Sequence, residues 1–176
     1  MQKEFSPGLT QIFYGNGKGK TTAALGITLR ACAQDYNVHL VQFLKNKNSS
    51  EILSLKKFSS FSYKKFGTGE WFIKNKNEEN HKQKAEEAFN YLKSCFEKGY
   101  NVIIADEILY AVQFSLLQEE KIIELIKQKP KNVELILTGS HKPFPKIFEL
   151  ADLVSEIKKI KHPYDKGILA RKGVDF

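Results

Sequence analysis

The sequence predicts an α/β fold, doubly wound, with a mainly parallel sheet and helices on both faces. Short apolar segments alternate with helical patterns along the whole chain, which is the order that strand–helix–strand units produce. Several of these segments are nearly continuous apolar runs, as expected for parallel strands that are buried on both faces. Because 176 residues fit one ordinary domain and no repeat or linker interrupts the alternation, residues 1–176 are expected to form a single domain.

Six segments predict strands. Their residues are β-branched, aromatic or otherwise apolar, and turn-forming residues flank them. The predicted strands are 9–14, 38–44, 61–66, 102–105, 133–137 and 153–157. The last three are short and nearly continuous apolar runs, so we expect buried parallel strands there.

Helices are predicted between the strands, where apolar residues recur at helical spacing. The predicted ranges are 23 to about 34, 50–58, 77–98, 117–129 and 145–150. Ser50 is expected to cap the second of them, and Gly99 stands where a glycine commonly ends a helix. In such folds ligands bind where the carboxyl ends of the strands meet, so we expect the functional residues at that edge.

The formal charge of +8 raises the question of nucleic-acid binding. Only Arg30 and Arg171 are arginines, although arginine is the residue that recognition of phosphates and bases favours. The lysines are scattered or mixed with glutamate, as in residues 75–84, which indicates a solvated surface. We therefore expect no nucleic-acid partner.

The apolar runs are far shorter than the roughly 20 residues that a membrane-spanning helix needs. The first five residues lack the layout of a signal peptide, because Ser6-Pro7-Gly8 follows them directly. No membrane association and a cytoplasmic location are therefore expected. The two cysteines, Cys32 and Cys95, lie far apart in helical patterns and are interpreted as buried, reduced thiols.

The strongest signal for function is the stretch Gly15-Asn16-Gly17-Lys18-Gly19-Lys20-Thr21-Thr22, between a predicted strand and a predicted helix. Glycines let backbone N–H groups turn toward an anion, and the helix presents its positive end to the same point. Lys18 and Lys20 add charge, Thr21 is placed to bind Mg²⁺ beside a nucleoside triphosphate, and Thr22 is a second candidate. The loop is one residue shorter than the usual P-loop pattern, whose first glycine would fall on Tyr14.

Two carboxylates, Asp106 and Glu107, follow the predicted strand 102–105. Because parallel strands end at one edge of a sheet, the pair is expected beside the phosphate loop, where a metal-bound phosphate needs carboxylates. Helix capping or plain exposure to solvent is the alternative interpretation. We predict that Lys20, Thr21 and Glu107 are catalytic, and that Thr21, Asp106 and Glu107 bind the metal.

The four histidines carry weaker signals. His39 lies in a predicted strand and is expected to pack, whereas His81 lies on a charged helix face and is expected to meet solvent. His141 and His162 lie in loops on either side of the last strand. For these two, a role at the ligand edge and a purely structural role both remain open.

Residues 15–26 resemble the shortened phosphate loop of the ATP:corrinoid adenosyltransferases, a family with a RecA-like P-loop fold. The similarity continues in order through 41–45, 106–111, 138–139, 151–156, 161–168 and 172–176. The sequence departs from the family's pattern at Asn46, where glycine is usual, at Leu109, where asparagine is common, and at Ser140-His141, where an arginine often follows Thr-Gly.

The resemblance implies a reaction in which the cobalt(I) of a corrinoid attacks the 5′ carbon of ATP and expels triphosphate, so that no phosphoryl group moves. Residues 15–22 would hold the triphosphate, in a direction opposite to that of ordinary P-loop enzymes, with Mg²⁺ bound beside it. A flavoprotein reductase as electron donor and a homodimer are further expectations from the family.

The aromatic loop of the family usually reads Gly-x-Gly-Phe-x-Trp, whereas here Gly69 is followed by Glu70, Trp71 and Phe72, which displaces both aromatics by one position. Cobalt(II) is hard to reduce while an axial ligand stays bound, so apolar side chains that crowd the lower face of the corrinoid would ease the reduction. Trp71 and Phe72 are the candidates for this role, and ordinary core packing is the alternative.

Two functions of other classes compete with this interpretation. A P-loop ATPase or kinase would act on the γ-phosphate and would need a residue that orients water or accepts a hydroxyl proton, for which the sequence offers no distinctive candidate. A RecA-like protein associated with nucleic acid would bind polynucleotides in a salt-dependent way, and the shortage of arginine argues against it.

Overall fold

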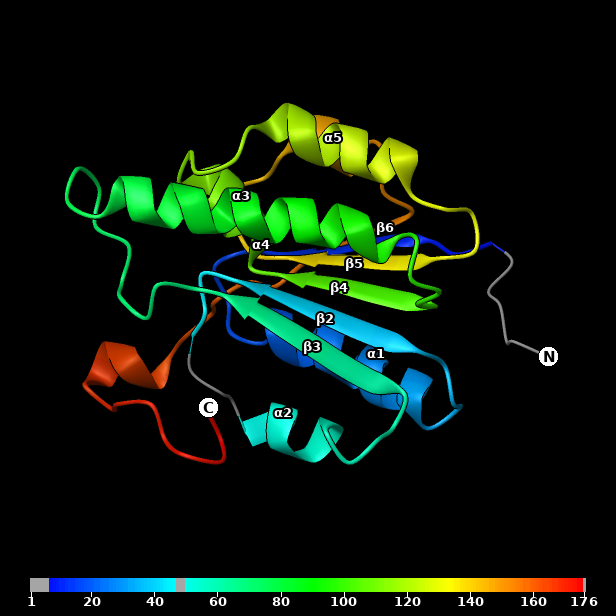
Figure 1. Ribbon diagram of the computed structural model, residues 1–176. Helices are drawn as coiled ribbons and strands as arrows, with labels where there is room; N and C mark the ends of the chain where they lie inside the picture. The colour runs from blue at the N-terminus through cyan, green and yellow to red at the C-terminus, as the bar shows by residue number, and fades with distance from the viewer. Residues whose placement is uncertain (1–6, 47–49, 176) are drawn as a thin grey trace.

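The structure is a computed structural model that describes residues 7–46 and 50–175. Its centre is a six-stranded sheet in the order β3-β2-β4-β5-β1-β6, and every neighbouring pair in that order is parallel. Helices cover both faces of this sheet (Figure 1). The predicted doubly wound α/β fold is therefore confirmed.

All six predicted strands are present with small shifts at their ends. They are β1 (Thr10–Tyr14), β2 (Val38–Phe43), β3 (Phe61–Phe66), β4 (Val102–Asp106), β5 (Glu134–Thr138) and β6 (Leu153–Glu156). The prediction of a buried strand is wrong for β6. This strand pairs with β1 alone at the edge of the sheet, and Leu153 and Val154 are 41% and 38% exposed.

The helices are α1 (Lys20–Cys32), α2 (Ser50–Leu55), α3 (Glu78–Cys95), α4 (Ile108–Gln113), α5 (Glu119–Gln128), α6 (Pro145–Phe148) and the 3₁₀ turn η1 (Pro163–Lys166). Helix α1 begins at Lys20 rather than at residue 23, and Ser50 is the first residue of α2 rather than its cap. Neither α4 nor η1 was predicted, because each is a short turn that follows directly on a strand end or a loop. Within the described ranges no helix combines the length and the hydropathy that crossing a bilayer requires.

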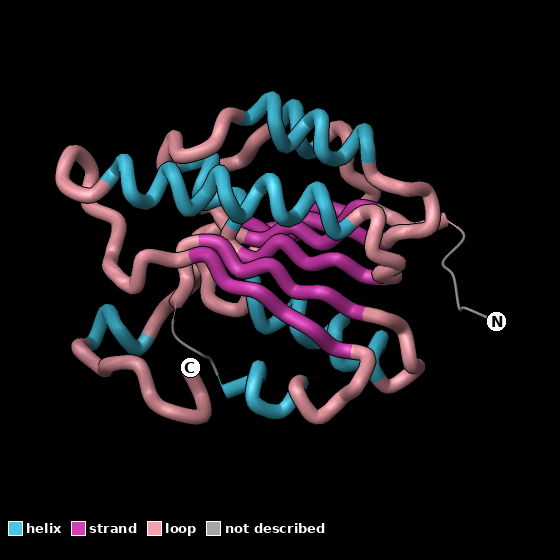
Figure 2. Tube along the Cα trace, viewed as in Figure 1, coloured by secondary structure: helices cyan, strands magenta, loops and turns pink. Residues whose placement is uncertain are grey.

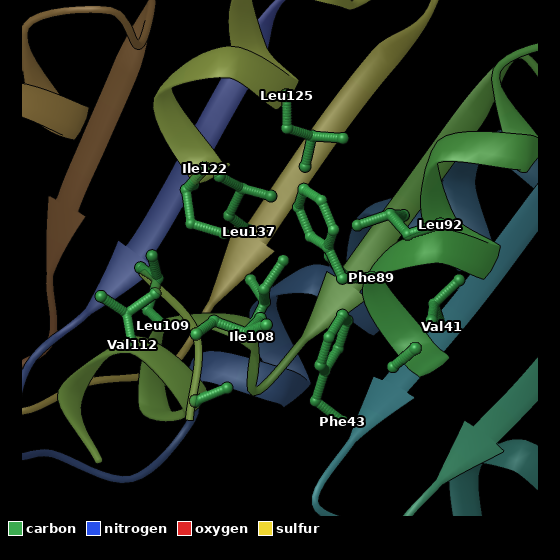
Figure 3. Close-up of a cluster of buried hydrophobic side chains, with 14 of the residues drawn as sticks. Val41, Phe43, Phe89, Leu92, Ile108, Leu109, Val112, Ile122, Leu125 and Leu137 are labelled. Carbon is green, nitrogen blue, oxygen red and sulfur yellow. The ribbon is translucent and has the colours of Figure 1, made fainter. Parts of the chain in front are cut away.

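The core consists of two apolar layers, one on each face of the sheet. Helices α3, α4 and α5 lie over one face, and α1 and α2 lie over the other (Figure 2). Neighbouring strand residues alternate between the layers: Val41 and Phe43 pack under α3, whereas Leu40 packs toward α1 and α2. Figure 3 shows the first layer, where Phe89 and Leu92 from α3 lie close to Leu137 of β5. Burial on both faces explains why the central strands are mostly apolar.

The carboxyl ends of the strands carry most of the residues that the sequence analysis proposed for the site. The loop after β1, the Asp106-Glu107 pair at β4 and Thr138 at β5 all lie along this edge. In Figure 1 the strand arrows point toward the side on which the C-terminal segment 157–175, drawn in orange and red, folds back. The strand order places β5 between β1 and β4, so Thr138 stands between the phosphate loop and the carboxylates.

Candidate nucleotide and corrinoid site

The phosphate loop joins β1 to α1 and turns sharply at Gly15. This residue has a φ of 112°, and a Cβ there would lie 2.4 Å from the carbonyl oxygen of Ile157, so only glycine fits. At the other end of the loop Gly19 is the N-cap of α1, and no side chain of the described residues caps the helix. The N–H groups of its first turn are therefore available to an anion.

Lys20 points back into the loop that precedes it. Its Nζ donates to the carbonyl oxygens of Gly15, at 2.7 Å, and Gly17, at 2.8 Å, and the residue is only 8% exposed. Burial lowers the pKa of Lys20, and the carboxylate of Glu107 opposes this effect. The loop thus holds one buried cation at its centre, as a phosphate cradle requires.

Two N–H groups of the phosphate loop form hydrogen bonds within the protein, although all of them were predicted to face the ligand. The N–H of Gly15 donates to the carbonyl of Ser140 at 2.9 Å, and that of Gly17 donates to the carbonyl of Ile157 at 2.7 Å. Their hydrogen bonds fix the loop against β5 and β6. An incoming phosphate would therefore meet the first-turn amides of α1 and the two lysines before it meets these two groups.

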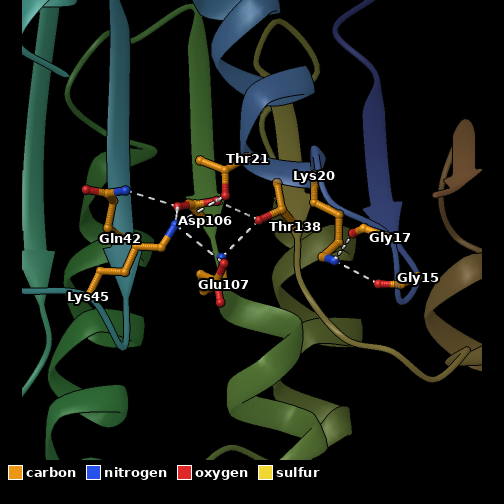
Figure 4. A network of polar contacts seen from close by, with 9 residues as sticks. All are labelled: Gly15, Gly17, Lys20, Thr21, Gln42, Lys45, Asp106, Glu107 and Thr138. Atoms are coloured by element: carbon orange, nitrogen blue, oxygen red, sulfur yellow. Dashed lines mark hydrogen bonds and ion pairs between the residues drawn. The ribbon is translucent and has the colours of Figure 1, made fainter. Parts of the chain in front are cut away.

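Asp106 is the centre of the polar network in Figure 4. Its Oδ1 accepts hydrogen bonds from the hydroxyls of Thr21, at 2.8 Å, and Thr138, at 2.7 Å. Its Oδ2 accepts from Gln42, at 3.0 Å, and from Lys45 Nζ, at 2.8 Å. Burial alone would raise the pKa of Asp106, but Lys45 and the other donors outweigh it and lower the pKa. Asp106 is thus a buried, ionised carboxylate that positions its neighbours.

Glu107 has a different environment from Asp106. Its φ is 68°, in the left-handed region, and its N–H donates to the hydroxyl of Thr138 at 3.0 Å. A left-handed backbone is unusual for glutamate, and here it places the side chain, which is 21% exposed, next to Lys45. Burial raises the pKa of Glu107, and Asp106 raises it further while Lys45 opposes the shift.

Lys45 is the main functional candidate that the sequence reasoning did not assign. Its Nζ lies 2.8 Å from Asp106 Oδ2, 3.2 Å from Thr21 Oγ1 and 3.4 Å from Glu107 Oε1. Burial alone would lower the pKa of Lys45, but Asp106 and Glu107 together raise it above its ordinary value. A positive charge therefore lies among the three residues that were predicted to bind Mg²⁺.

A cavity of about 290 Å³ opens beside the phosphate loop. Asn16, Lys18 and Lys20 line one side of it, and the C-terminal segment lines the other with Lys159, Tyr164 and Asp165. His141 and His162 also line this cavity. The ring of His141 stacks edge-on against Tyr110, and His162 Nδ1 accepts from the N–H of Tyr164 at 3.2 Å. The structure thus places both histidines at the ligand edge.

Besides the bond between Gly17 and Ile157, two side chains of the phosphate loop contact the C-terminal segment. The side chain of Asn16 accepts a hydrogen bond from the N–H of Lys159 at 2.9 Å. Lys18 forms an ion pair with Asp175 and donates to the carbonyl of Val174 at 3.3 Å. Two of the loop residues that were predicted to hold triphosphate, Asn16 and Lys18, therefore contact residues 159–175 in this structure.

Trp71 and Phe72 lie on the loop between β3 and α3 and have opposite environments. Trp71 is 91% exposed, whereas the ring of Phe72 stacks on Phe114 and meets His81 edge-on. The prediction that His81 meets solvent is wrong, because this loop folds over the start of α3 and leaves His81 1% exposed. The Nε2 of His81 lies 3.1 Å from Thr68 Oγ1, so the histidine anchors the aromatic loop.

Three residues of the network were not singled out from the sequence: Gln42, Lys45 and Thr138. Each stands at or just after the carboxyl end of a strand, which is where parallel sheets gather functional groups. Applying that rule to the ends of β2 and β5, and not only to those of β1 and β4, would have identified these three residues as candidates. The two remaining candidates, Thr21 and Thr22, lie in the first turn of α1 rather than in the loop before it, and of these Thr21 contacts Asp106.

Comparisons with known proteins identify the family of the chain. A family model described as "ATP:corrinoid adenosyltransferase BtuR/CobO/CobP" matches residues 6–176. The "Corrinoid adenosyltransferase" of Escherichia coli (strain K12) is 31% identical over 179 residues, covering 99% of this chain and 89% of the relative. The "Corrinoid adenosyltransferase CobA" of Salmonella typhimurium (strain LT2) has the same identity and coverage. The Pseudomonas aeruginosa "Corrinoid adenosyltransferase" is 30% identical over 96% of this chain and 84% of its own length.

A solved structure titled "The cytoplasmic domain of EssC" shares the fold alone, with a TM-score of 0.53 and 15% sequence identity. It covers 96% of this chain, which in turn spans 34% of that protein. The family match, by contrast, extends over nearly the whole sequence and includes the phosphate loop, the carboxylate pair and the C-terminal segment. The chain therefore belongs to the ATP:corrinoid adenosyltransferase family.

Proposed function

We propose that this chain transfers the 5′-deoxyadenosyl group of ATP to the cobalt(I) centre of a corrinoid, with triphosphate as the other product. The observation that carries the proposal is that the oxygens of Thr21, Asp106 and Glu107 lie together beside the phosphate loop, in a chain of this family. Residues 1–176 are proposed to act as one nucleotide- and corrinoid-binding domain.

The reaction is a substitution at carbon. The electron pair of cobalt(I) forms the bond to C5′, the bond between C5′ and its oxygen breaks, and triphosphate leaves with the electrons of that C5′–O bond. No protein nucleophile and no base are needed, so the protein's task is to orient ATP and to neutralise the leaving group. Lys20 is placed for this task, since its ammonium lies inside the loop and its two carbonyl partners are replaceable by phosphate oxygens.

Mg²⁺ fits the residues at the end of β4. Thr21 donates its proton to Asp106, which leaves the lone pairs of its oxygen for a cation, and the carboxylate of Glu107 is partly exposed on the same side. Hydroxyl and carboxylate oxygens are the hard ligands that Mg²⁺ prefers. When bound, the ion would add positive charge to the triphosphate. Thr21 and Glu107 are the proposed ligands, and Asp106, whose oxygens already accept four hydrogen bonds, is proposed to position Thr21.

The aromatic loop is proposed to contact the corrinoid. Trp71 is 91% exposed, which is unusual for the largest apolar side chain, and Phe72 anchors the loop by stacking on Phe114. A planar ring system of low polarity would cover Trp71 and exclude water from the cobalt. This arrangement supports a role for Trp71 in contacting the corrinoid and for Phe72 in holding the loop.

The competing functions have less support. Chemistry at the γ-phosphate needs a side chain that orients water or accepts a proton, whereas Asp106, the carboxylate that contacts Thr21, is 0% exposed and accepts four hydrogen bonds. Polynucleotide binding needs a basic surface rich in arginine, and the sequence contains two arginines. A cytoplasmic location, a homodimer and a flavoprotein reductase as electron donor complete the proposal as expectations from the family.

The test is an anaerobic assay with chemically reduced cobalamin, ATP and Mg²⁺. Loss of the cobalt(I) absorbance, a light-sensitive adenosyl product and an equal amount of triphosphate are expected. Lys20→Ala should lose the activity, and Lys84→Ala, which removes an exposed lysine paired with Glu87 on α3, should keep it. Formation of ADP and phosphate without an adenosylated corrinoid would favour the ATPase instead.

A further inference from the structure

Lys45 is held in a fixed position at the end of β2. The preceding residue, Leu44, has a φ of 57°, which is rare for a bulky side chain and directs the chain out of the strand. On the other side, a Cβ at Gly67 would lie 2.4 Å from the carbonyl carbon of Lys45, so the β3–α3 loop packs directly on this backbone. A strained turn and a close backbone contact together position the lysine.

The ammonium of Lys45 has oxygen neighbours from two other parts of the chain. Thr21 comes from α1, and Asp106 and Glu107 come from the end of β4. The three oxygens lie 2.8 to 3.4 Å from Nζ, and Figure 4 shows that the lysine side chain points at them. Because Thr21 gives its proton to Asp106, its oxygen presents a lone pair to Lys45.

Two of these oxygens, those of Thr21 and Glu107, are the ones that the proposed function assigns to the magnesium site. An ammonium and a divalent cation cannot both fill the space among them, since each needs the same lone pairs and the two repel one another. Without any cation, a fully buried Asp106 and a largely buried Glu107 would repel each other across adjacent residues. The two carboxylates therefore need a neighbouring positive charge even when no metal is bound.

We infer that Lys45 is the internal counter-ion of this site: its ammonium occupies the metal position in the nucleotide-free chain and competes with the divalent cation for it. The inference rests on the proposed function, because it takes Thr21 and Glu107 as the metal ligands. The inference explains why the chain would bind the metal together with triphosphate. Free Mg²⁺ must displace the ammonium of Lys45, whereas the triphosphate offers that ammonium new hydrogen-bond partners.

A purely structural ion pair is the alternative role for Lys45, and the affinity for a metal separates the two. Mn²⁺ is used as the probe, and its free concentration is followed by electron paramagnetic resonance without nucleotide. Lys45→Met should bind Mn²⁺ at least about tenfold more tightly than wild type, because it leaves a buried carboxylate pair without its counter-ion. In metal-free buffer the same variant should melt more than about 5 °C below wild type and recover when MgCl₂ is added.

Lys45→Arg tests the opposite direction and keeps the charge. A guanidinium binds carboxylates through two hydrogen bonds and is harder to displace than an ammonium, so the ATP complex of this variant should bind Mn²⁺ at least about fivefold more weakly than wild type. Lys121→Met is the matched control. Like Lys45, Lys121 has a side chain that is 34% exposed and pairs with a carboxylate. Its partner is Glu86, and this pair joins α5 to α3. Loss of Lys121 should leave Mn²⁺ binding unchanged.

The outcomes separate this inference from the function on which it rests. If wild type with ATP takes up no Mn²⁺, the metal site of the proposed function fails and the inference fails with it. If wild type with ATP binds Mn²⁺, but the folded Lys45→Met and Lys45→Arg proteins both bind it within about twofold of wild type, only the role of Lys45 is overturned. Should Lys45→Met not fold, the result with Lys45→Arg alone decides.

Discussion

The hydroxyl of Thr21 donates to Asp106 Oδ1 at 2.8 Å and so joins the first turn of α1 to the end of β4. Thr138, the last residue of β5, donates to the same oxygen at 2.7 Å. This pair of bonds fixes the rotamer of Thr21 and directs its remaining lone pairs away from Asp106. The hydrogen bond to Asp106 therefore holds Thr21 in place for its proposed role as a ligand.

Thr21→Ala should lower kcat/KM for ATP about 100-fold, which corresponds to about 2.7 kcal/mol, because it removes both a proposed ligand and a donor to a buried carboxylate. Thr21→Ser keeps the hydroxyl and should retain most of the activity. The measurement is the initial rate of adenosylcobalamin formation as a function of Mg²⁺ concentration. Equal rates for the alanine and serine variants at every Mg²⁺ concentration would contradict the assignment of Thr21 as a ligand.

The contact between Lys18 and the C-terminal segment leads to a second prediction. Asp175 pairs with Lys18 and also accepts from the backbone N–H and the Nε of Arg171, at 2.8 and 3.0 Å. Asp175→Asn should weaken all three contacts, so amide hydrogen exchange in 158–175 should accelerate. It should also free Lys18 for the triphosphate and raise the affinity for ATP by up to about threefold, a range typical of exposed ion pairs.

Hydrogen exchange by mass spectrometry and ATP titration by calorimetry measure the two effects of Asp175→Asn. Glu86→Gln provides the control, because it removes a carboxylate that pairs with Lys121 far from the phosphate loop. A weaker affinity for ATP in Asp175→Asn would show instead that Asp175 holds Lys18 in its binding position.

The strands and the phosphate loop could be predicted from the sequence because their signals are local. The buried parallel strand β4 is apolar up to its last residue, Asp106, and the backbone itself requires a glycine at Gly15 of the loop. β6 was mispredicted as buried because an apolar run does not show whether a strand has one neighbour or two. Its position at the edge depends on the order of all six strands.

The part of the site that the sequence did not predict depends on contacts between distant residues. Lys45 follows a strand, like many solvated lysines, and only the side-by-side pairing of β2 with β4 brings it to Asp106. His81 lies in a helix whose surface is charged, and it is buried because residues 67–77 fold over it. In both cases the deciding partner lies at least thirteen residues away in the sequence, beyond the reach of periodicity.

The aromatic loop gives a prediction that separates binding from stability. Trp71→Ala should change the free energy of unfolding by less than about 0.5 kcal/mol, because the side chain is 91% exposed, and should weaken corrinoid binding about tenfold. Phe72→Ala should cost about 2 kcal/mol of stability, since it removes the stacking on Phe114. Urea denaturation followed by circular dichroism gives the stabilities.

Trp71 is the single tryptophan of the chain, so its fluorescence provides a test of the proposed contact with the corrinoid. In the wild-type protein, addition of cobalamin should quench this emission with the same midpoint as that found by calorimetry. If Trp71→Ala binds cobalamin as tightly as wild type, or if the emission of wild type does not change, Trp71 does not contact the corrinoid.

His39 makes the stability of the fold depend on pH. It is 2% exposed on β2, its Nδ1 lies 2.7 Å from Ser62 Oγ, and its ring stacks on Tyr100. Burial, with smaller contributions from Lys98 and Lys64, lowers the pKa of His39 from 6.5 to about 4. The unfolded chain therefore takes up this proton at a higher pH than the folded chain does, and acid favours unfolding.

The contribution of His39 to stability is complete above the unfolded pKa of 6.5 and is lost as the pH falls toward 4. Between about pH 7.5 and about pH 5 the expected loss is about 2 kcal/mol in the free energy of unfolding. The glutamine in His39→Gln has no proton to take up. The free energy of unfolding of this variant should therefore fall by about 2 kcal/mol less than that of wild type over the same pH range. Urea denaturation of both proteins at the two pH values measures the difference, and equal pH dependence in the two would mean that His39 titrates alike in the folded and unfolded chains.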